Sequence, residues 1–177
     1  MSQQDALRLA RWTVTSGSNT QSRGAVVIDG GDHNWQASSQ GNGAVDALFG
    51  AVDAALEEVL QGHPRLVAYD VHAVAEGPDA EGVVKIRIRP PESAHGARAA
   101  GEYDGESKSA NIIAASIEAY VEAINTMLEE AHWAGAADEA GHEKRASRPG
   151  APAGSAGKRA EFDQDEANHD TTAWFEQ

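Results

Sequence analysis

The sequence of 177 residues contains no cysteine. Disulfide bonds and thiolate-ligated metal sites are therefore excluded, and a reducing, cytoplasmic location is expected. No apolar run approaches the ~20 residues that a transmembrane helix requires. The first residues also lack the apolar core of a signal peptide. We therefore expect no membrane association.

An excess of positive charge is also absent, because 28 acidic residues face 14 lysines and arginines. The net charge is −14. The first 133 residues hold 19 acids and nine bases, and residues 134–177 hold nine acids and five bases. Non-specific binding to nucleic acid requires a basic surface, so no nucleic-acid partner is expected.

The composition changes after Trp133. Residues 134–177 are dominated by alanine, glycine, proline, serine and charged residues, with no apolar period. This composition predicts a disordered tail. The aromatic cluster "TTAWFEQ" at its end is either a flexible end or a short docking motif. Residues 1–10 are expected to be an N-terminal extension, and residues 11–133 a folded domain.

The first half of this domain, residues 11–62, predicts three strands and a helix. A helix is expected from about Ala44 to Leu60, because its apolar residues recur at helical spacing. Gly62 and Pro64 end it. Alternating or β-branched segments predict the strands at 11–17, 23–31 and 33–39.

The same order begins again in residues 65–133. A second helix is expected from about Ala110 to His132, with Ser109 as its N-cap. Strands are expected at 65–77, 82–90 and 97–105. Short polar segments, "QGNG" and "ESKS", precede the two helices. A single βββα unit cannot bury both its sheet and its helix, so we predict an α+β fold in which two βββα units pack together.

The turn Gly41-Asn42-Gly43 comes directly before the first helix. A dinucleotide fingerprint requires a third glycine where Asp46 stands, and the Lys-Ser/Thr of a Walker motif is missing, so we reject nucleotide binding. Two interpretations remain open. The helix N-terminus could hold a carboxylate or another anion. Alternatively, the glycines could serve a tight turn that needs a positive φ.

Other chemical motifs are missing from the sequence. The seven histidines form no HExxH motif, and no nucleophile elbow or distinctive acid pair is present, so we expect no metal, no cofactor and no catalytic site. His72, within a strand, is expected to have a structural role. Asp46 is placed where it could meet the ammonium group of a ligand. The alternating Lys85, Arg87 and Arg89 are typical of the solvated face of an antiparallel sheet.

Three segments in order resemble the C-terminal regulatory domain of 2-isopropylmalate synthase, the leucine-inhibited enzyme of leucine biosynthesis; citramalate synthase carries a related domain. The segments are "GNGAVDALFGAV" (41–52), "LVAYDVHAVAEGPDAEG" (66–82) and "SANIIAASIEAYVEAIN" (109–125). Their order and spacing agree with that family across about residues 11–130.

The resemblance implies a homodimer that binds leucine, or a similar small amino acid, between the two βββα units. Small and apolar side chains there would accept a branched aliphatic side chain, and the helix starts would face the carboxylate. Ala44 stands where the family usually has proline, and Ala110 stands where some members have proline. By motif, the implied ligand-binding residues are Gly43, Val45, Asp46, Leu66, Tyr69, Ala73, Ala80, Ala110 and Asn111.

In that family catalysis takes place in a TIM barrel of ~250 residues, for which the sequence offers no candidate segment. We therefore expect no synthase activity from this chain alone. The resemblance implies a stand-alone regulatory and dimerisation domain linked to leucine biosynthesis, which acts on a separate synthase catalytic subunit. Two alternatives remain. One is a non-sensing dimerisation or interaction protein whose tail contacts a partner. The other is a barrel-less remnant of a synthase.

Overall fold

A computed structural model describes residues 6–146 of the chain. Two antiparallel three-stranded sheets are each followed by a helix, so the predicted βββα repeat is confirmed. The first unit consists of β1 (Leu7–Gly17), β2 (Thr20–Gly30), β3 (His33–Gly41), α1 (Ala44–Ala55) and the short α2 (Glu57–Leu60). The second consists of β4 (Arg65–Ala73), β5 (Gly82–Arg89), the 3₁₀ turn η1 (Gly96–Ala99), β6 (Tyr103–Ser109) and α3 (Ile112–Leu128). The 3₁₀ turn η2 (Ala131–Trp133) and α4 (Ala136–Ala146) follow.

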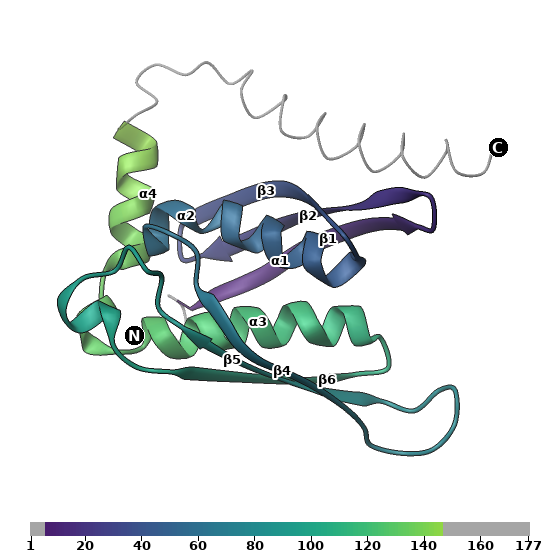
Figure 1. The fold of residues 1–177 in the computed structure, drawn as a ribbon. Coiled ribbons are helices and arrows are strands. Elements are labelled where there is room, and N and C mark those ends of the chain that lie inside the picture. Colours follow the sequence, from purple (N-terminus) through teal and green to yellow (C-terminus); the bar gives the residue numbers. More distant parts are fainter. Residues whose placement is uncertain (1–5, 147–177) are drawn as a thin grey trace.

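The two long helices lie between the two sheets (Figure 1). α1 packs on β2 and β3, α3 packs on β5 and β6, and the two helices contact each other. Both begin at the same end of the molecule, at the right in Figure 1, and α4 lies at the opposite end. No helix among the described residues is both long and apolar enough to cross a bilayer.

Small residues let each helix approach its sheet closely. A Cβ atom on Gly105 of β6 would collide with backbone atoms of Ala119 and Ala123 on α3. A Cβ atom on Gly24 of β2 would stand 3.0 Å from the backbone of Ala47 on α1. The equivalent contacts in the two units show that both use glycine at the point where the helix crosses the sheet.

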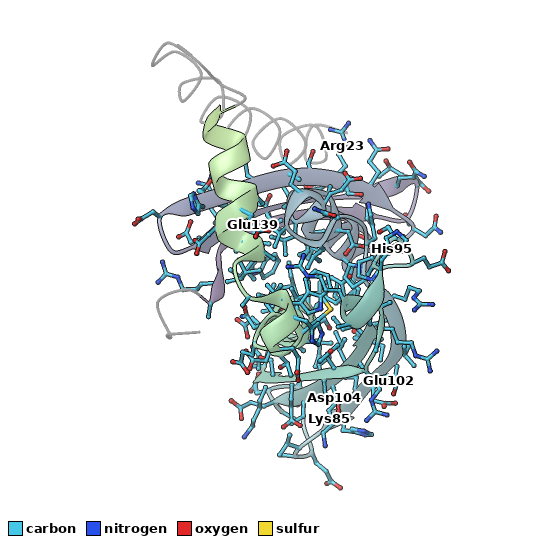
Figure 2. All side chains as sticks on the ribbon, turned by 90° about the vertical axis from the view of Figure 1, so that its left-hand side faces the viewer. Arg23, Lys85, His95, Glu102, Asp104 and Glu139 are labelled. Atoms are coloured by element: carbon cyan, nitrogen blue, oxygen red, sulfur yellow. The ribbon has the colours of Figure 1, made fainter. Side chains whose placement is uncertain are left out.

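Outward-facing residues of the second sheet are charged (Figure 2). On β5, buried Val84, Ile86 and Ile88 alternate with exposed basic residues. The solvated face that the sequence predicts is therefore confirmed. Its basic residues Lys85 and Arg87 form ion pairs at 3.5 and 2.7 Å with Glu106 and Asp104 of β6, and Arg89 forms one at 2.6 Å with Glu102, directly before β6.

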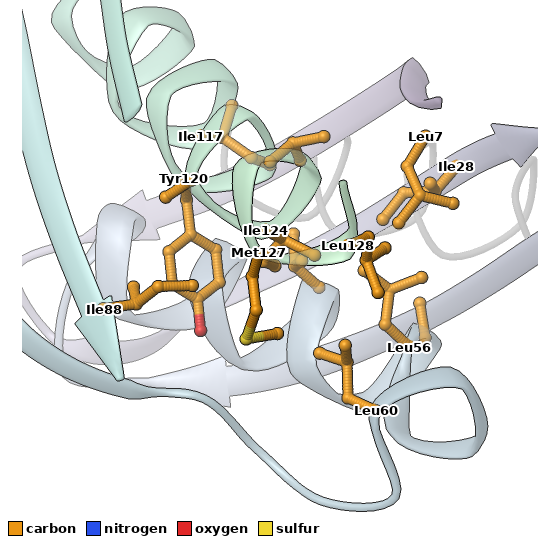
Figure 3. Packing of buried hydrophobic residues seen from close by; sticks show 14 of the residues in the cluster. Leu7, Ile28, Leu56, Leu60, Ile88, Ile117, Tyr120, Ile124, Met127 and Leu128 are labelled. Carbon is orange, nitrogen blue, oxygen red and sulfur yellow. The ribbon is translucent and has the colours of Figure 1, made fainter. Parts of the chain in front are cut away.

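The buried apolar residues form one cluster to which both units contribute (Figure 3). Ile28 and Leu56 come from the first unit, and Ile88, Ile124 and Met127 from the second, and each is almost fully buried. Apolar burial on this scale is the main favourable contribution to folding. The two units therefore share a core, as predicted from the inability of one unit to bury its own faces.

Several predicted boundaries are wrong, and three of them change the description of the fold. The third strand of the second unit spans Tyr103–Ser109 rather than 97–105, because a 3₁₀ turn occupies Gly96–Ala99 and Gly101 has a φ of 103°. The segment "ESKS" is consequently strand, and only residues 110–111 separate it from α3. The first strand starts at Leu7, inside the expected extension of residues 1–10.

The expected disordered tail begins with an ordered helix. α4 spans Ala136–Ala146, and Ala136 and Ala140 are buried, so the predicted disorder is wrong for this segment. Trp133 before it is 2% exposed, and the guanidinium of Arg98 lies 4.9 Å from its ring centroid. α4 packs through small residues rather than through large apolar ones. Its sequence therefore shows no large apolar residues at helical spacing that would predict a helix. The rest of the expected tail, residues 147–177 with "TTAWFEQ", lies outside the described residues.

Candidate functional site

The turn before α1 brings a carboxylate back onto the backbone. The N–H of Asn42 donates to Oδ2 of Asp46 at 2.9 Å. Gly41 lies directly against this carboxylate, so any larger residue there would collide with it. Neither Gly41 nor Gly43 has a positive φ, and the interpretation of a turn that needs one is therefore wrong. At Gly41 the glycine is required by close approach.

The N-terminus of α1 keeps unsatisfied backbone donors. Its N-cap is Gly43, which has no side chain to accept a hydrogen bond. The first N–H that bonds within the helix is that of Ala47, which donates to the carbonyl of Gly43 at 3.0 Å. The N–H groups of Ala44, Val45 and Asp46 in the first helical turn are left for water or a ligand, and the helix dipole makes this end favourable for an anion.

The N-terminus of α3 is closed by its own residues. Its N-cap is Asn111 rather than the predicted Ser109. The amide oxygen of Asn111 accepts from the N–H groups of Ile113 and Ala114 at 3.0 and 3.2 Å. The hydroxyl of Ser109 accepts from the N–H of Asn111 at 3.0 Å. The two helix starts therefore differ, and an anion has free donors only at α1.

Aromatic rings connect β4 to both helices. The ring of Phe49 on α1 stacks on that of Tyr120 on α3, with centroids 4.4 Å apart and planes at 16°. Tyr69 on β4 meets Phe49 edge-on at 6.0 Å, and its hydroxyl lies 2.7 Å from the hydroxyl of Ser116 on α3. Tyr69 therefore faces the helices, between the second turns of α1 and α3.

The residues that the resemblance assigns to β4 share one face of the strand. Leu66 and Tyr69 lie opposite the buried Ile88 and Ile86, and Ala73 lies opposite Gly82. Gly82 is in tight contact with the side chain of Ile112, which places Ala73 near the start of α3. Leu66, seven residues away, stands at the other end of the strand, ~23 Å distant at the usual rise.

The remaining assigned residues surround the helix starts or lie in the hairpin after β4. Val45 and Asp46 form the first turn of α1, and Ala110 precedes the N-cap of α3. Ala80 lies in the hairpin between β4 and β5, where its N–H donates to the carbonyl of Gly77 at 3.2 Å. The structure thus brings two helix starts, Tyr69 and Ala73 to one end of the molecule, and it separates Leu66 from them.

A second polar cluster joins the two helices one turn further along. The hydroxyl of Tyr120 donates to Oδ1 of Asp53 at 2.5 Å. The ring of His63 stands 3.7 Å from both Asp53 and Glu57. Burial raises the pKa of Asp53, an effect that the contacts with Tyr120 and His63 partly offset. Burial also raises the pKa of Tyr120, which therefore stays protonated and donates to the carboxylate.

Sequence reasoning missed this cluster and the aromatic contacts. In the sequence, Phe49 and Tyr120 belong to the apolar spacing that predicts the two helices, and no motif surrounds Asp53. One signal was present, because Asp53 follows Phe49 by one helical turn and interrupts an otherwise apolar face. Within the described residues, no group of three or more histidine and carboxylate side chains is arranged to hold a metal ion.

A shallow depression of about 500 Å³ lies on the second sheet, away from the helix starts. Its lining includes Asp70, Lys85, Arg87 and Asp104. Each of its basic groups already faces a carboxylate, and the acids of the lining outnumber the bases, so the depression offers no free positive charge to an anion. The start of α1, with free donors beside a carboxylate, is the stronger candidate for a site.

Comparison with known proteins identifies the relatives of this chain. Residues 1–128 match the family described as the LeuA allosteric (dimerisation) domain. A 2-isopropylmalate synthase of Methylobacterium nodulans is 34% identical over 124 residues, which are 70% of this chain and 22% of that protein. The 2-isopropylmalate synthase of Salinibacter ruber is 32% identical over 126 residues, 70% of this chain and 20% of that protein. That of Xylella fastidiosa is 34% identical over 125 residues, 71% and 22% respectively.

The matched region thus spans about a fifth of the length of these relatives. The family match covers both βββα units, from the strand that begins at Leu7 to the end of α3 at Leu128. α4 lies after the matched region. This chain belongs to the family of LeuA allosteric (dimerisation) domains.

Proposed function

We propose that this chain is a regulatory domain that self-associates and binds a small amino acid, leucine or a close analogue, at the start of α1. The observation that carries the proposal is that free backbone N–H groups and the Asp46 carboxylate lie side by side at that helix start. An amino acid presents the complementary pair of groups, a carboxylate and an ammonium. Membership of the allosteric domain family supports an effector as the ligand.

In the proposed complex, the ligand carboxylate accepts hydrogen bonds from the first-turn N–H groups of α1, near Gly43 and Val45. The ligand ammonium pairs with Asp46, which is exposed and already oriented by its bond from Asn42. The ligand side chain would face Tyr69 and Ala73 on β4. The side chains near the start of α3, at Ala110 and Asn111, would border the other side. Leu66 takes no part in this pose, because it lies at the far end of β4 from the helix starts.

We propose further that the chain has no synthase activity of its own. Its match is to the allosteric part of synthases, and it spans about a fifth of their length. Effector binding would then act on the catalytic domain of a 2-isopropylmalate synthase, held in a separate subunit, in cytoplasmic leucine biosynthesis. The proposed output is a change in the affinity or activity of that partner when the effector is bound.

Calorimetric titration tests effector binding. Leucine, isoleucine and valine are titrated into the full chain, and we expect a saturable heat for at least one of them. Asp46→Asn should weaken that binding by ~10-fold or more, because a charge-assisted bond to the ammonium is lost. Glu58→Gln, which changes an exposed acid on α2, is the matched control and should leave affinity unchanged. Absence of heat with all three at millimolar concentration would exclude amino-acid sensing.

A second candidate function is self-association without sensing. The observation that favours it is the Tyr69 hydroxyl, which is already engaged by Ser116, together with the stacked Phe49 and Tyr120 beside it. These contacts satisfy part of the site without a ligand. The same titration separates the two candidates, because a dimer that binds none of the three amino acids supports only the second.

A further inference from the structure

The exposed apolar side chains of the molecule are concentrated on one strand. Among the described residues, every large hydrophobic side chain that is exposed lies on β4 or directly after it. Such a concentration differs from the scattered single exposures that are normal on a protein surface. The exposed fractions are 48% for Leu66, 44% for Val67, 38% for Tyr69, 43% for Val71 and 53% for Val74.

These side chains belong mainly to a single face of the strand. Leu66, Tyr69 and Val71 lie opposite residues of β5 that are buried beneath α3. Val67 occupies the irregularity between Leu66 and Ala68, where the register shifts. The opposite face carries polar residues such as Asp70 and His72, and both are exposed. The expected structural role of His72 therefore has no support from burial. We name Leu66, Val67, Tyr69 and Val71 the β4 strip.

The equivalent strand of the first unit has a cover that β4 lacks. β1 also stands at the edge of its sheet, with a register shift after Leu9 that corresponds to the one after Leu66 in β4. α3 packs against β1, and the side chain of Asn125 bonds both backbone groups of Leu7. Leu7 is consequently 3% exposed, and Leu9 and Trp12 are partly buried.

The first unit does not supply the matching cover for β4. α1 has 12 residues, whereas α3 has 17. Leu56 interrupts the helix after Ala55, and Gln61 in the left-handed conformation ends the short α2. α1 contacts β4 through the ring of Phe49, which packs edge-on against Tyr69. The β4 strip is left open because the chain turns away before a helix can cross it.

We infer that a second copy of this chain covers the β4 strip, and that the strip is the central contact of the dimer. This inference rests on the self-association in the proposed function. Two strips related by a twofold axis would meet through the same side chains, with Tyr69 as the aromatic anchor and no charged residue on that face from Leu66 to Val71. The depletion of charge is what the centre of an interface requires.

The exposed apolar area is large enough to form the centre of a dimer contact. The four side chains of the strip and Val74 expose roughly 400 Å², if a residue of this kind offers about 150–250 Å² when open. That is about half of the ~800 Å² that each partner contributes to a standard interface. A polar margin around the strip, which would include the β4–β5 hairpin, would supply the rest.

Sedimentation equilibrium of the full chain tests the inference with two adjacent substitutions. Val71→Glu places a charge on the strip, and His72→Glu places the same charge one residue away on the polar face. We expect the wild type to be a dimer at micromolar concentration. Val71→Glu should weaken dimerisation by ~100-fold or more, and His72→Glu by less than about 3-fold. Circular dichroism checks folding, and Val71→Thr, which keeps a β-branched residue, replaces Val71→Glu if that variant unfolds.

The outcomes separate this inference from the proposed function. A dimeric wild type whose Val71→Glu and Val71→Thr variants remain dimeric at equal affinity overturns the β4 strip but leaves self-association intact. A wild type that is monomeric at ~100 μM overturns both the proposed role of the β4 strip and self-association. The same holds if a different protein, rather than a second copy of this chain, binds β4. Effector binding is measured independently by calorimetry, so its failure is recognised separately.

Discussion

Asn125 on α3 bonds both backbone groups of Leu7 on β1. The N–H of Leu7 donates to the side-chain oxygen of Asn125 at 2.8 Å, and the side-chain nitrogen donates to the carbonyl of Leu7 at 2.7 Å. One amide side chain thus acts as the neighbouring strand for the beginning of β1. This pair joins the second unit to the first within the buried interior.

Loss of this pair should destabilise the fold. Asn125→Ala leaves two buried backbone groups of Leu7 without partners, and we expect a loss of about 2–4 kcal/mol in the free energy of unfolding. Urea denaturation measures it. Asn42→Ala, at an exposed position where only the backbone is bonded, is the control and should cost less than about 0.5 kcal/mol. Equal losses in the two variants would contradict the assigned role of Asn125.

Because α3 lies close to β6, a larger residue at Gly105 should destabilise the fold. Gly105→Ala forces a Cβ atom into the backbone of α3 at Ala119 and Ala123. We expect a loss of about 3 kcal/mol or more, because helix and sheet must separate. At Gly43, where nothing lies within 4 Å of an added Cβ atom, alanine should cost under about 1 kcal/mol. Thermal and urea unfolding compare the two, and a reversed order would show that the helix–sheet contact adapts freely.

The partly buried carboxyl of Asp53 predicts an unusual pH dependence. Burial raises its pKa, so the native state holds the proton more tightly than the unfolded state does. Its contribution to stability is therefore present at acid pH and is lost as pH rises from about 4, the unfolded value, through the raised native value. Asp53→Asn still accepts from the Tyr120 hydroxyl, and it should gain stability relative to wild type between pH 4 and pH 7.

Asp104 provides the control of opposite sign. The hydrogen bond from Arg87 lowers the pKa of Asp104. Its contribution is present above the unfolded pKa and disappears as pH falls through the lowered native value. Asp104→Asn should therefore lose stability relative to wild type over the same pH range, by a small amount because the pair is exposed. Melting temperatures at several pH values decide this, and a parallel loss in both variants would contradict the raised pKa of Asp53.

The sequence was sufficient to predict the repeat but not its boundaries. The βββα order follows from alternation in the strands and from helical spacing in α1 and α3, both of which are local patterns. The start of β1 at Leu7 depends on Asn125, which is 118 residues away, and no local pattern contains that contact. The displacement of β6 depends on the backbone at Gly101, and α4 is held by small residues that give no apolar period.

The candidate site was predictable only in part. The motifs place candidate residues at both helix starts and on the fourth strand, and in the structure Tyr69 and Ala73 share one face of β4. They did not predict that Asn111 caps α3 while the N-terminus of α1 stays open, because short polar segments precede both helices in the sequence. Nor did they predict the distance of Leu66 or the burial of Asp53, since each depends on how the two units pack.

The central claim is that an amino acid binds at the open start of α1. A titration of the ¹⁵N-labelled full chain with leucine, followed by amide NMR shifts, tests it most directly. The account predicts saturable shifts at Ala44, Val45 and Asp46, with smaller changes at Ile113 and Ala114, whose N–H groups Asn111 already bonds. Unchanged amides at Ala44–Asp46 under saturating leucine, or shifts confined to the outer face of β5, would contradict it.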